Sequence, residues 1–313
     1  MNVLRCFALL SIVAWMMLLP MVQARSPLAQ RHLETLQRDY SQTNRWEALD
    51  PVDVREYVLP LTSLGEEEVD WLPVLRPLAH ELTQNTQTPL EAAMVLNRYL
   101  WKRIGVIYST KREKANQDPL HSIRLGLASC SGLSILLVDA CRSLGIPARV
   151  VGCLWRHKPG NHSWVEVKSN GQWYPLGAFE DCPPDQLWFL DDAAQADAGS
   201  ARYAIYAACA TPGNAVFYGW GVPAENVTQH YVKAHTSAQT SIRIYYAAER
   251  NGERVSVPFR VNGHAYTTPG PLQDLNDYAV IELSEVAPFE VEMEGNRYRY
   301  ECQPGAIIVE QLP

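Results

Sequence analysis

A cysteine at the start of an apolar helix and a histidine at the start of a strand are the residues of this chain best suited to chemistry. Cys130 leads into an apolar run, and His162 follows 32 residues later. A thiol is a useful nucleophile only as the thiolate, and both a helix N-terminus and a nearby imidazole lower a cysteine pKa below its free value of about 8.5. A single cysteine on an apolar helix is usually a core residue. The order of cysteine-helix, strand and histidine-strand nevertheless favours a nucleophile–base pair of Cys130 and His162.

The other cysteines and histidines indicate no metal site. Six cysteines follow residue 24: Cys130, Cys141, Cys153, Cys182, Cys209 and Cys302. If Cys130 is the nucleophile, five remain and at least one of them must also stay reduced; the disulfide that we expect joins Cys182 to Cys209. Because no CxxC spacing, HExxH motif or close histidine pair occurs, we expect neither a metal nor a cofactor.

The elements that must position the pair have recognisable ends. The apolar pattern predicts a helix from about Cys130 to Leu144, which Gly145-Ile146-Pro147 would end. A strand is predicted over 148–155, and residues 156–161 form a loop that leads to His162. The nucleophile helix would therefore be followed directly by strands on which it can pack.

A hairpin is the strongest local prediction. Two runs with strand character, 162–169 and 172–179, flank Asn170-Gly171, a pair suited to a two-residue turn with positive φ at both positions. In the register that this turn imposes, residue 169 faces 172, 167 faces 174, 164 faces 177 and 162 faces 179. Alternation then places four residues on one face, namely His162, Trp164, Gly177 and Phe179.

The regions on either side of the hairpin differ from it in their predicted secondary structure, and we expect three folded regions in the chain. Residues 25–87 read as mostly helical. The core is expected over 88–235, beginning with Thr88 as the N-cap of a helix that has Pro89 at its first position. Short β-type runs separated by turn residues predict a small β-sandwich, similar to an immunoglobulin domain, over 236–313.

The N-terminus and the composition limit the compartment and the partners. The apolar run within residues 1–24, with Arg5 before it and Val22-Gln23-Ala24 after it, predicts a cleavable signal peptide and a secreted or periplasmic protein. No later segment is long and apolar enough to span a membrane. The formal net charge of −7 excludes the basic surplus that nucleic-acid binding requires.

The chain resembles the transglutaminase-like superfamily of papain-like thiol enzymes. The segments that carry the resemblance are Gly126–Gly132, Leu144–Val150, His162–Val167 and Gly171–Pro175. The resemblance implies an α+β fold, with a nucleophile helix packed on an antiparallel sheet, an N-terminal helical region and a C-terminal β-sandwich. It also implies that Cys130 is the nucleophile, that His162 is the base, and that a third residue on the next strand, usually Asp, orients the histidine.

At the position of that third residue the chain departs from the family pattern, because Gly177 stands there. The nearest acids are Glu180 and Asp181. Strict alternation would turn Glu180 away from His162, and a bulge at Gly177 would reverse this. Two readings follow: Glu180 is the orienting residue, or no side chain orients His162 and catalysis is weak.

Two hypotheses about function follow from these residues. In the first, the protein is a secreted or periplasmic cysteine enzyme that cleaves or transfers amide bonds in polypeptide or cell-wall peptide through a Cys130 thioester. In the second, it is a catalytically weak or inactive relative that binds peptide or glycan. An acid in contact with His162 would favour the first.

Overall fold

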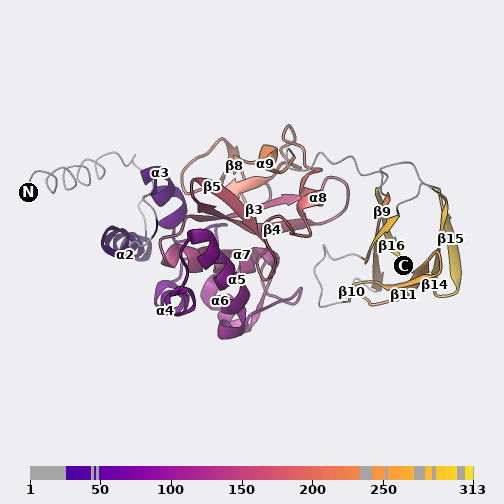
Figure 1. Ribbon diagram of the computed structural model, residues 1–313, viewed down its shortest axis with the longest axis horizontal. Helices are drawn as coiled ribbons and strands as arrows, with labels where there is room; N and C mark the ends of the chain where they lie inside the picture. Colours follow the sequence, from indigo (N-terminus) through magenta and orange to yellow (C-terminus); the bar gives the residue numbers. More distant parts are fainter. Residues whose placement is uncertain are drawn as a thin grey trace, which may run out of the picture.

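Helices α4 to α7 lie on one side of an antiparallel sheet, and the short helices α8 and α9 lie on its other side (Figure 1). This computed structural model describes residues 26–43, 46, 49–232, 242–250, 253–270, 279–283, 287–301 and 307–312. The predicted α+β class, with a helix packed on an antiparallel sheet, is confirmed. The predicted signal peptide at 1–24 and the thiol of Cys302 lie outside the described residues.

Most of the helices precede the sheet along the chain. They are α2 (Pro27–Thr43), α3 (Pro51–Asp53), the π-helical turn η1 (Val54–Val58), α4 (Leu72–Thr83), α5 (Pro89–Ile104), α6 (Pro119–Leu125), α7 (Cys130–Ser143), α8 (Leu190–Ala193) and α9 (Thr228–Val232). Helix α5 begins as predicted, because the Thr88 hydroxyl accepts a hydrogen bond from the Glu91 amide. No described helix has the length and apolar character of a membrane span.

The central sheet has six strands in the order β5-β4-β3-β6-β8-β7, and every pairing in it is antiparallel. The strands are β3 (Ala148–Leu154), β4 (Asn161–Ser169), β5 (Gln172–Leu176), β6 (Tyr206–Ala208), β7 (Ala215–Val216) and β8 (Pro223–Asn226). A separate two-stranded parallel sheet joins β1 (Ile107–Tyr108) to β2 (Leu127–Ala128), just before α7.

The predicted hairpin is present, but its second strand is shorter than expected. Asn170 and Gly171 both have positive φ, and Ser169 faces Gln172 as predicted. The register holds as far as Val165 and Leu176, where β5 ends. The predicted pairs 164–177 and 162–179 are wrong, because the chain leaves the sheet at Gly177 and enters a turn.

The two faces of β3 and β4 belong to two different cores. Val150 and Val165 pack into the core that contains α7, whereas Val151 and Trp164 pack into a second core with residues of the 187–193 region. Successive residues of a strand point to opposite faces, so residue parity alone decides which core a side chain enters. The same rule decides where His162 lies.

The N-terminal helices share the α7 core. Leu36 of α2 and Leu75 of α4 are in the same buried cluster as Leu96 of α5 and Leu133 of α7. Helices α2 and α4 therefore bury apolar surface against α5 and α7.

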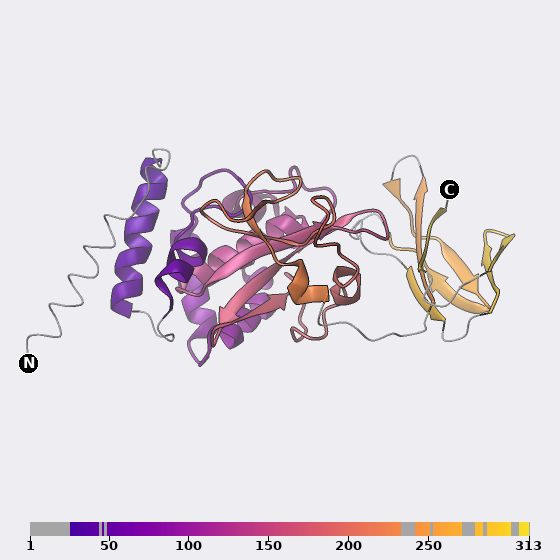
Figure 2. The same ribbon diagram turned by 90° about the horizontal axis from the view of Figure 1, so that it is seen from above.

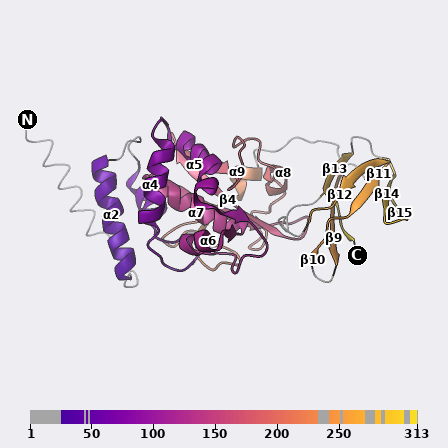
Figure 3. The ribbon, with the colours of Figure 1, turned by 90° about the horizontal axis from the view of Figure 1, so that it is seen from below.

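The C-terminal strands form two four-stranded sheets that gather apart from the central sheet (Figures 2 and 3). Their strands are β9 (Ile242–Arg250), β10 (Glu253–Arg254), β11 (Pro258–Val261), β12 (His264–Thr267), β13 (Ala279–Leu283), β14 (Phe289–Met293), β15 (Asn296–Tyr300) and β16 (Ile307–Leu312). Tyr246 and Ile281 of one sheet pack against Phe259 and Val291 of the other. This arrangement is consistent with the predicted small sandwich.

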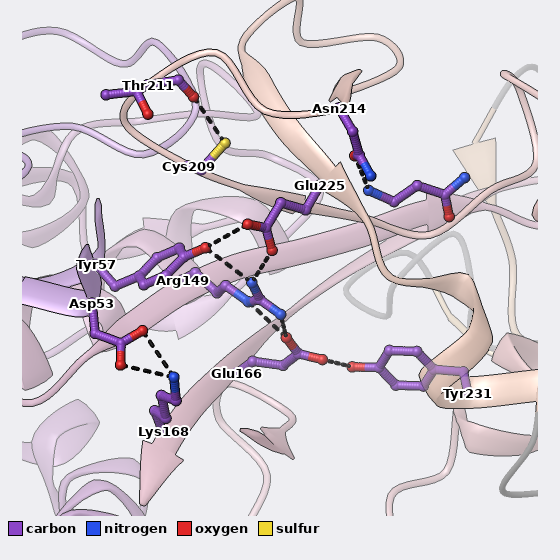
Figure 4. Close-up of polar contacts among 11 residues, drawn as sticks. Asp53, Tyr57, Arg149, Glu166, Lys168, Cys209, Thr211, Asn214, Glu225 and Tyr231 are labelled. Carbon is purple, nitrogen blue, oxygen red and sulfur yellow. Dashed lines mark hydrogen bonds and ion pairs between the residues drawn. The ribbon is translucent and has the colours of Figure 1, made fainter. Parts of the chain in front are cut away.

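A largely buried network of polar and charged side chains joins several elements of the central sheet (Figure 4). The Arg149 guanidinium donates to Glu166 Oε2 at 2.8 Å and to Glu225 Oε2 at 2.8 Å. Glu166 Oε1 accepts from the Tyr231 hydroxyl at 2.6 Å, and the Tyr231 hydroxyl accepts from the Trp164 indole at 2.7 Å. The network therefore connects β3, β4, β8 and α9.

Buried His32 is expected to make the protein acid-sensitive. The His32 ring packs edge-on against Trp71 and has no hydrogen-bond partner among the described residues, and burial, helped by Arg142, lowers its pKa to about 4. The unfolded chain therefore binds more protons, so stability is full above about pH 6.5 and falls as the pH drops toward 4. We expect a loss of about 2–3 kcal/mol from this residue between pH 7.5 and 4.5, measured by urea unfolding.

His32→Leu tests this prediction, and His230→Leu, at an exposed position of α9, is the control. His32→Leu should reduce the pH dependence of the unfolding free energy, and His230→Leu should leave it unchanged. An equal pH dependence in wild type and His32→Leu would contradict the prediction.

Candidate active site

Cys130 is the first residue of α7, as predicted. The Ser129 hydroxyl caps the helix by accepting a hydrogen bond from the Gly132 amide at 3.0 Å, and it donates to the Ala115 carbonyl at 2.5 Å. The Cys130 side chain is partly exposed. A partly exposed thiol at a capped helix N-terminus lies in the positive end of the helix dipole, which favours the thiolate.

The start of α7 touches β4 beside His162. The hydroxyls of Ser131 and Ser163 are 3.0 Å apart and both are buried. Cys130 and His162 directly precede these two serines in the chain, so the first turn of α7 and the beginning of β4 lie together. Because Ser163 faces α7, His162 faces the other side of β4. Cys130 and His162 are each adjacent in the chain to the contact between Ser131 and Ser163, so both lie where α7 and β4 begin.

The His162 imidazole lies in an aromatic cage. Its ring centroid is 4.8 Å from that of Trp188 and 4.9 Å from that of Phe189, and Trp155 and Trp164 lie near 6 Å. The residue is 6% exposed, and burial, with Lys158 as the second cause, lowers its pKa to about 3. The imidazole is therefore neutral at pH 7, as a general base must be before it accepts a proton.

A buried ion pair between Lys158 and Asp192 holds the 156–160 loop, which precedes β4, in place. Lys158 Nζ lies 2.6 Å from Asp192 Oδ2, and His157 Nε2 lies 2.8 Å from Asp192 Oδ1. Burial by itself would raise the pKa of Asp192, but its hydrogen bonds with His157 and Lys158 leave that pKa lowered. The Asp192 carboxylate is thus charged and holds the 156–160 loop against the aromatic cage.

Glu180 occupies the space that a side chain at position 177 would fill. A Cβ built on Gly177 would lie 2.2 Å from the Glu180 carboxyl carbon. Glu180 Oε1 lies 4.0 Å from His162 Nε2. This separation exceeds a hydrogen bond, and it becomes an ion pair only once the imidazole is protonated. Catalytic hydrogen bonds are often long before substrate binds. The carboxylate therefore comes to His162 from three residues further along the chain than the family pattern expects.

A turn, rather than the bulge considered above, brings Glu180 back to His162. The Glu180 amide donates to the Gly177 carbonyl at 3.0 Å, which closes a four-residue turn over 177–180. Phe179, its third residue, has a φ of +75°. This φ is typical of glycine in a type II turn and costs another residue about 1 kcal/mol or more.

Trp188 and Asn97 contact this turn, and the sequence analysis singled out neither. The Trp188 indole donates to Glu180 Oε1 at 2.8 Å while its ring covers His162. Asn97 of α5 hydrogen-bonds the turn backbone. The sequence does contain a signal for Asn97, because it is a polar residue within the apolar stripe formed by Leu96, Leu100 and their neighbours. No local pattern marks Trp188.

The expected disulfide between Cys182 and Cys209 is wrong. The structure joins neither cysteine in a disulfide, and the Cys209 sulfur lies 3.1 Å from the Thr211 carbonyl oxygen. Burial raises the pKa of each of the four described thiols other than Cys130, which are Cys141, Cys153, Cys182 and Cys209. Within the described part of the chain, no group of three His, Cys, Asp or Glu side chains could hold a metal ion.

Residues 76–178 match the model of the transglutaminase-like superfamily. The matched segment contains Cys130 and His162 and ends two residues before Glu180. Among curated proteins, none matches the chain in sequence.

Several solved structures resemble parts of the chain. A "putative cysteine protease" from Cytophaga hutchinsonii is 18% identical over 45% of this chain and 47% of its own, with a TM-score of 0.35. The periplasmic domain of TgpA from Pseudomonas aeruginosa is 21% identical over 39% and 49%, with a TM-score of 0.29. A transglutaminase from red sea bream is 11% identical over 80% and 62%, with a TM-score of 0.42. The chain thus spans about half the length of the first two structures.

Proposed function

We propose that this chain, whose residues 76–178 match the model of the transglutaminase-like superfamily, is a secreted or periplasmic cysteine enzyme that hydrolyses amide bonds in peptides. The observation that carries the proposal is the Glu180 carboxylate, which lies 4.0 Å from His162 in the space left by Gly177. It supports an acid–base role for His162 although the family's usual Asp is missing. Polypeptide or cell-wall peptide is the substrate class that the proposed compartment favours.

In the proposed reaction the Cys130 sulfur attacks the amide carbonyl carbon, and the imidazole of His162 takes the thiol proton. The carbonyl oxygen becomes an oxyanion, which backbone N–H groups at the start of α7 can stabilise. The C–N bond then breaks, His162 returns the proton to the leaving amine, and a thioester remains on Cys130. Water, deprotonated by His162, attacks the thioester and releases the carboxylic acid and the thiol.

The roles of the two nitrogens of His162 follow from this scheme. Nε2 faces Glu180, so Nδ1 is the atom left to exchange the proton with Cys130. A carboxylate beside Nε2 favours the tautomer with the proton on Nε2 and stabilises the imidazolium as it forms, which offsets the cost of charging a ring that burial keeps neutral. We assign the catalytic region to residues 88–235 and a separate folded unit to 236–313.

The reactivity of Cys130 toward iodoacetamide tests the proposal without a known substrate. The rate is measured across pH by mass spectrometry of each cysteine-containing peptide, in wild type, His162→Ala and Glu180→Gln. Wild-type Cys130 should react at pH 7 at least about tenfold faster than Cys182 or Cys209, since one pKa unit changes the thiolate fraction tenfold. Each variant should lose about tenfold of this rate.

The other described thiols serve as internal standards, because burial raises their pKa values. An ordinary thiol profile for Cys130, with a midpoint of about 8.5 and no change in His162→Ala, would overturn the enzyme proposal. That outcome would favour the second candidate, a peptide- or glycan-binding relative, for which the family's missing Asp at Gly177 is the supporting observation.

A further inference from the structure

One buried asparagine of α5 holds the turn that carries Glu180. The Asn97 side chain is 3% exposed. Its Nδ2 donates to the Gly177 carbonyl at 2.8 Å and to the Glu180 carbonyl at 2.6 Å, and its Oδ1 accepts from the Phe179 amide at 2.9 Å. A single amide group therefore bonds three of the four residues of the turn.

Only an amide can make this set of contacts at one position. The turn offers two carbonyl acceptors and one N–H donor, and the asparagine side chain supplies two donor hydrogens and one acceptor oxygen. An aspartate would lack the donors, and an alanine would leave three buried or partly buried backbone groups without these partners. The donors and acceptor of the Asn97 side chain thus match those of the turn backbone, whereas packing on the apolar face of α5 would not by itself require an amide.

The turn requires this support because its conformation is unfavourable for its sequence. Phe179 has a φ of +75°, and the bond between the Glu180 amide and the Gly177 carbonyl closes the turn from within. The Phe179 ring lies 5.6 Å from the Trp101 ring, and the Trp101 indole in turn donates to the Asn97 carbonyl at 2.5 Å. One turn of α5 thereby contacts both the backbone and the side chain at the strained residue.

We propose that Asn97 is a positioning residue, which keeps the 177–180 turn in the conformation that delivers the Glu180 carboxylate to His162. The inference rests on the proposed function, in which Glu180 assists His162. Without the amide, Phe179 is expected to relax to a negative φ. The direction of the chain at Glu180 then changes, and the carboxylate leaves the space beside Gly177.

A double-mutant cycle on Cys130 reactivity tests this role. Asn97→Ala and Glu180→Gln should each slow iodoacetamide alkylation of Cys130 at pH 7 by about tenfold and shift the midpoint of its pH profile upward. Because both act through one carboxylate, the double variant should react within about twofold of Glu180→Gln alone. A purely structural role for Asn97 would instead slow the reaction equally in both backgrounds, and this result would overturn the inference.

A rescue variant, a control and a substitute variant complete the test. Phe179→Gly in the Asn97→Ala background should recover most of the lost rate, since glycine takes a positive φ without strain. Leu75→Val, at a buried position of α4, should lower thermal stability and leave Cys130 reactivity unchanged. If Asn97→Ala does not fold, Asn97→Asp replaces it with nearly unchanged volume and the same expected loss.

The inference and the proposed function fail in different ways. If His162→Ala leaves Cys130 unaffected, the proposed function is wrong. If Glu180→Gln slows alkylation and neither Asn97 variant does, only the positioning role is wrong.

Discussion

Replacing Gly177 with alanine is expected to slow iodoacetamide alkylation of Cys130 at pH 7 by about tenfold while the protein stays folded. An added Cβ would lie 2.2 Å from both the carboxyl carbon and Oε2 of Glu180, closer than packed atoms allow. The clashing group is the far end of a flexible side chain, so it can move without disturbing the backbone. Gly177 has no positive φ that would strain an alanine. The substitution should therefore displace only the carboxylate.

A swap of the carboxylate provides the control for this prediction. The double variant Gly177→Asp with Glu180→Ala places an acid at the position where the family usually has one, and it should recover the rate to within about threefold of wild type. Rates and melting temperatures are measured together. Wild-type reactivity in Gly177→Ala would show that the carboxylate contributes nothing at 4.0 Å from His162.

Replacing Arg149 with methionine is expected to lower the free energy of unfolding by about 3–5 kcal/mol. The Arg149 and Glu166 side chains are 1% and 3% exposed, with 2.7 Å between Nη2 and Oε2. The guanidinium also stacks over the Trp173 ring at 4.0 Å (Figure 4 shows its polar partners). Its removal leaves a buried carboxylate without a counter-charge, which is the costly way to break a buried ion pair. Urea unfolding at pH 7.5 measures the loss.

Two further variants identify the cause of the loss. Arg149→Met combined with Glu166→Gln should be more stable than Arg149→Met alone, because the uncompensated charge is removed. Arg103→Met, which removes an exposed ion pair with Glu81, should leave the unfolding midpoint nearly unchanged. Equal stability of Arg149→Met and wild type would mean that the network contributes no net stability.

Local rules predicted the elements of the site, and they failed where the chain leaves regular structure. The start of α7 at Cys130 and the turn at Asn170-Gly171 follow from capping and turn chemistry, which act over a few residues. The register that this turn imposes predicts pairing as far as Phe179, but pairing ends at Leu176, one residue before Gly177. There Asn97, which is 80 residues earlier in the chain, hydrogen-bonds the backbone and stabilises a turn that local preference disfavours.

The disulfide prediction failed for a similar reason. Counting cysteines bounds which pairs can form, but only folding places two Cβ atoms within bonding reach. Cys182 lies just after the Glu180 turn, while Cys209 follows β6 and contacts Thr211.

The order of Cys130, strand and His162 and the turn of the hairpin could be predicted from the sequence, because each depends on residue type and short spacing; the fold class followed from the resemblance to the transglutaminase-like superfamily. The approach of Glu180 to His162 through a turn could not be predicted, nor could the aromatic cage around His162 on the face of β4 away from α7. These outcomes depend on contacts between residues distant in the chain, chiefly those of Asn97 and Trp188. Such contacts form only when the helices and the sheet have packed, so no local pattern encodes them.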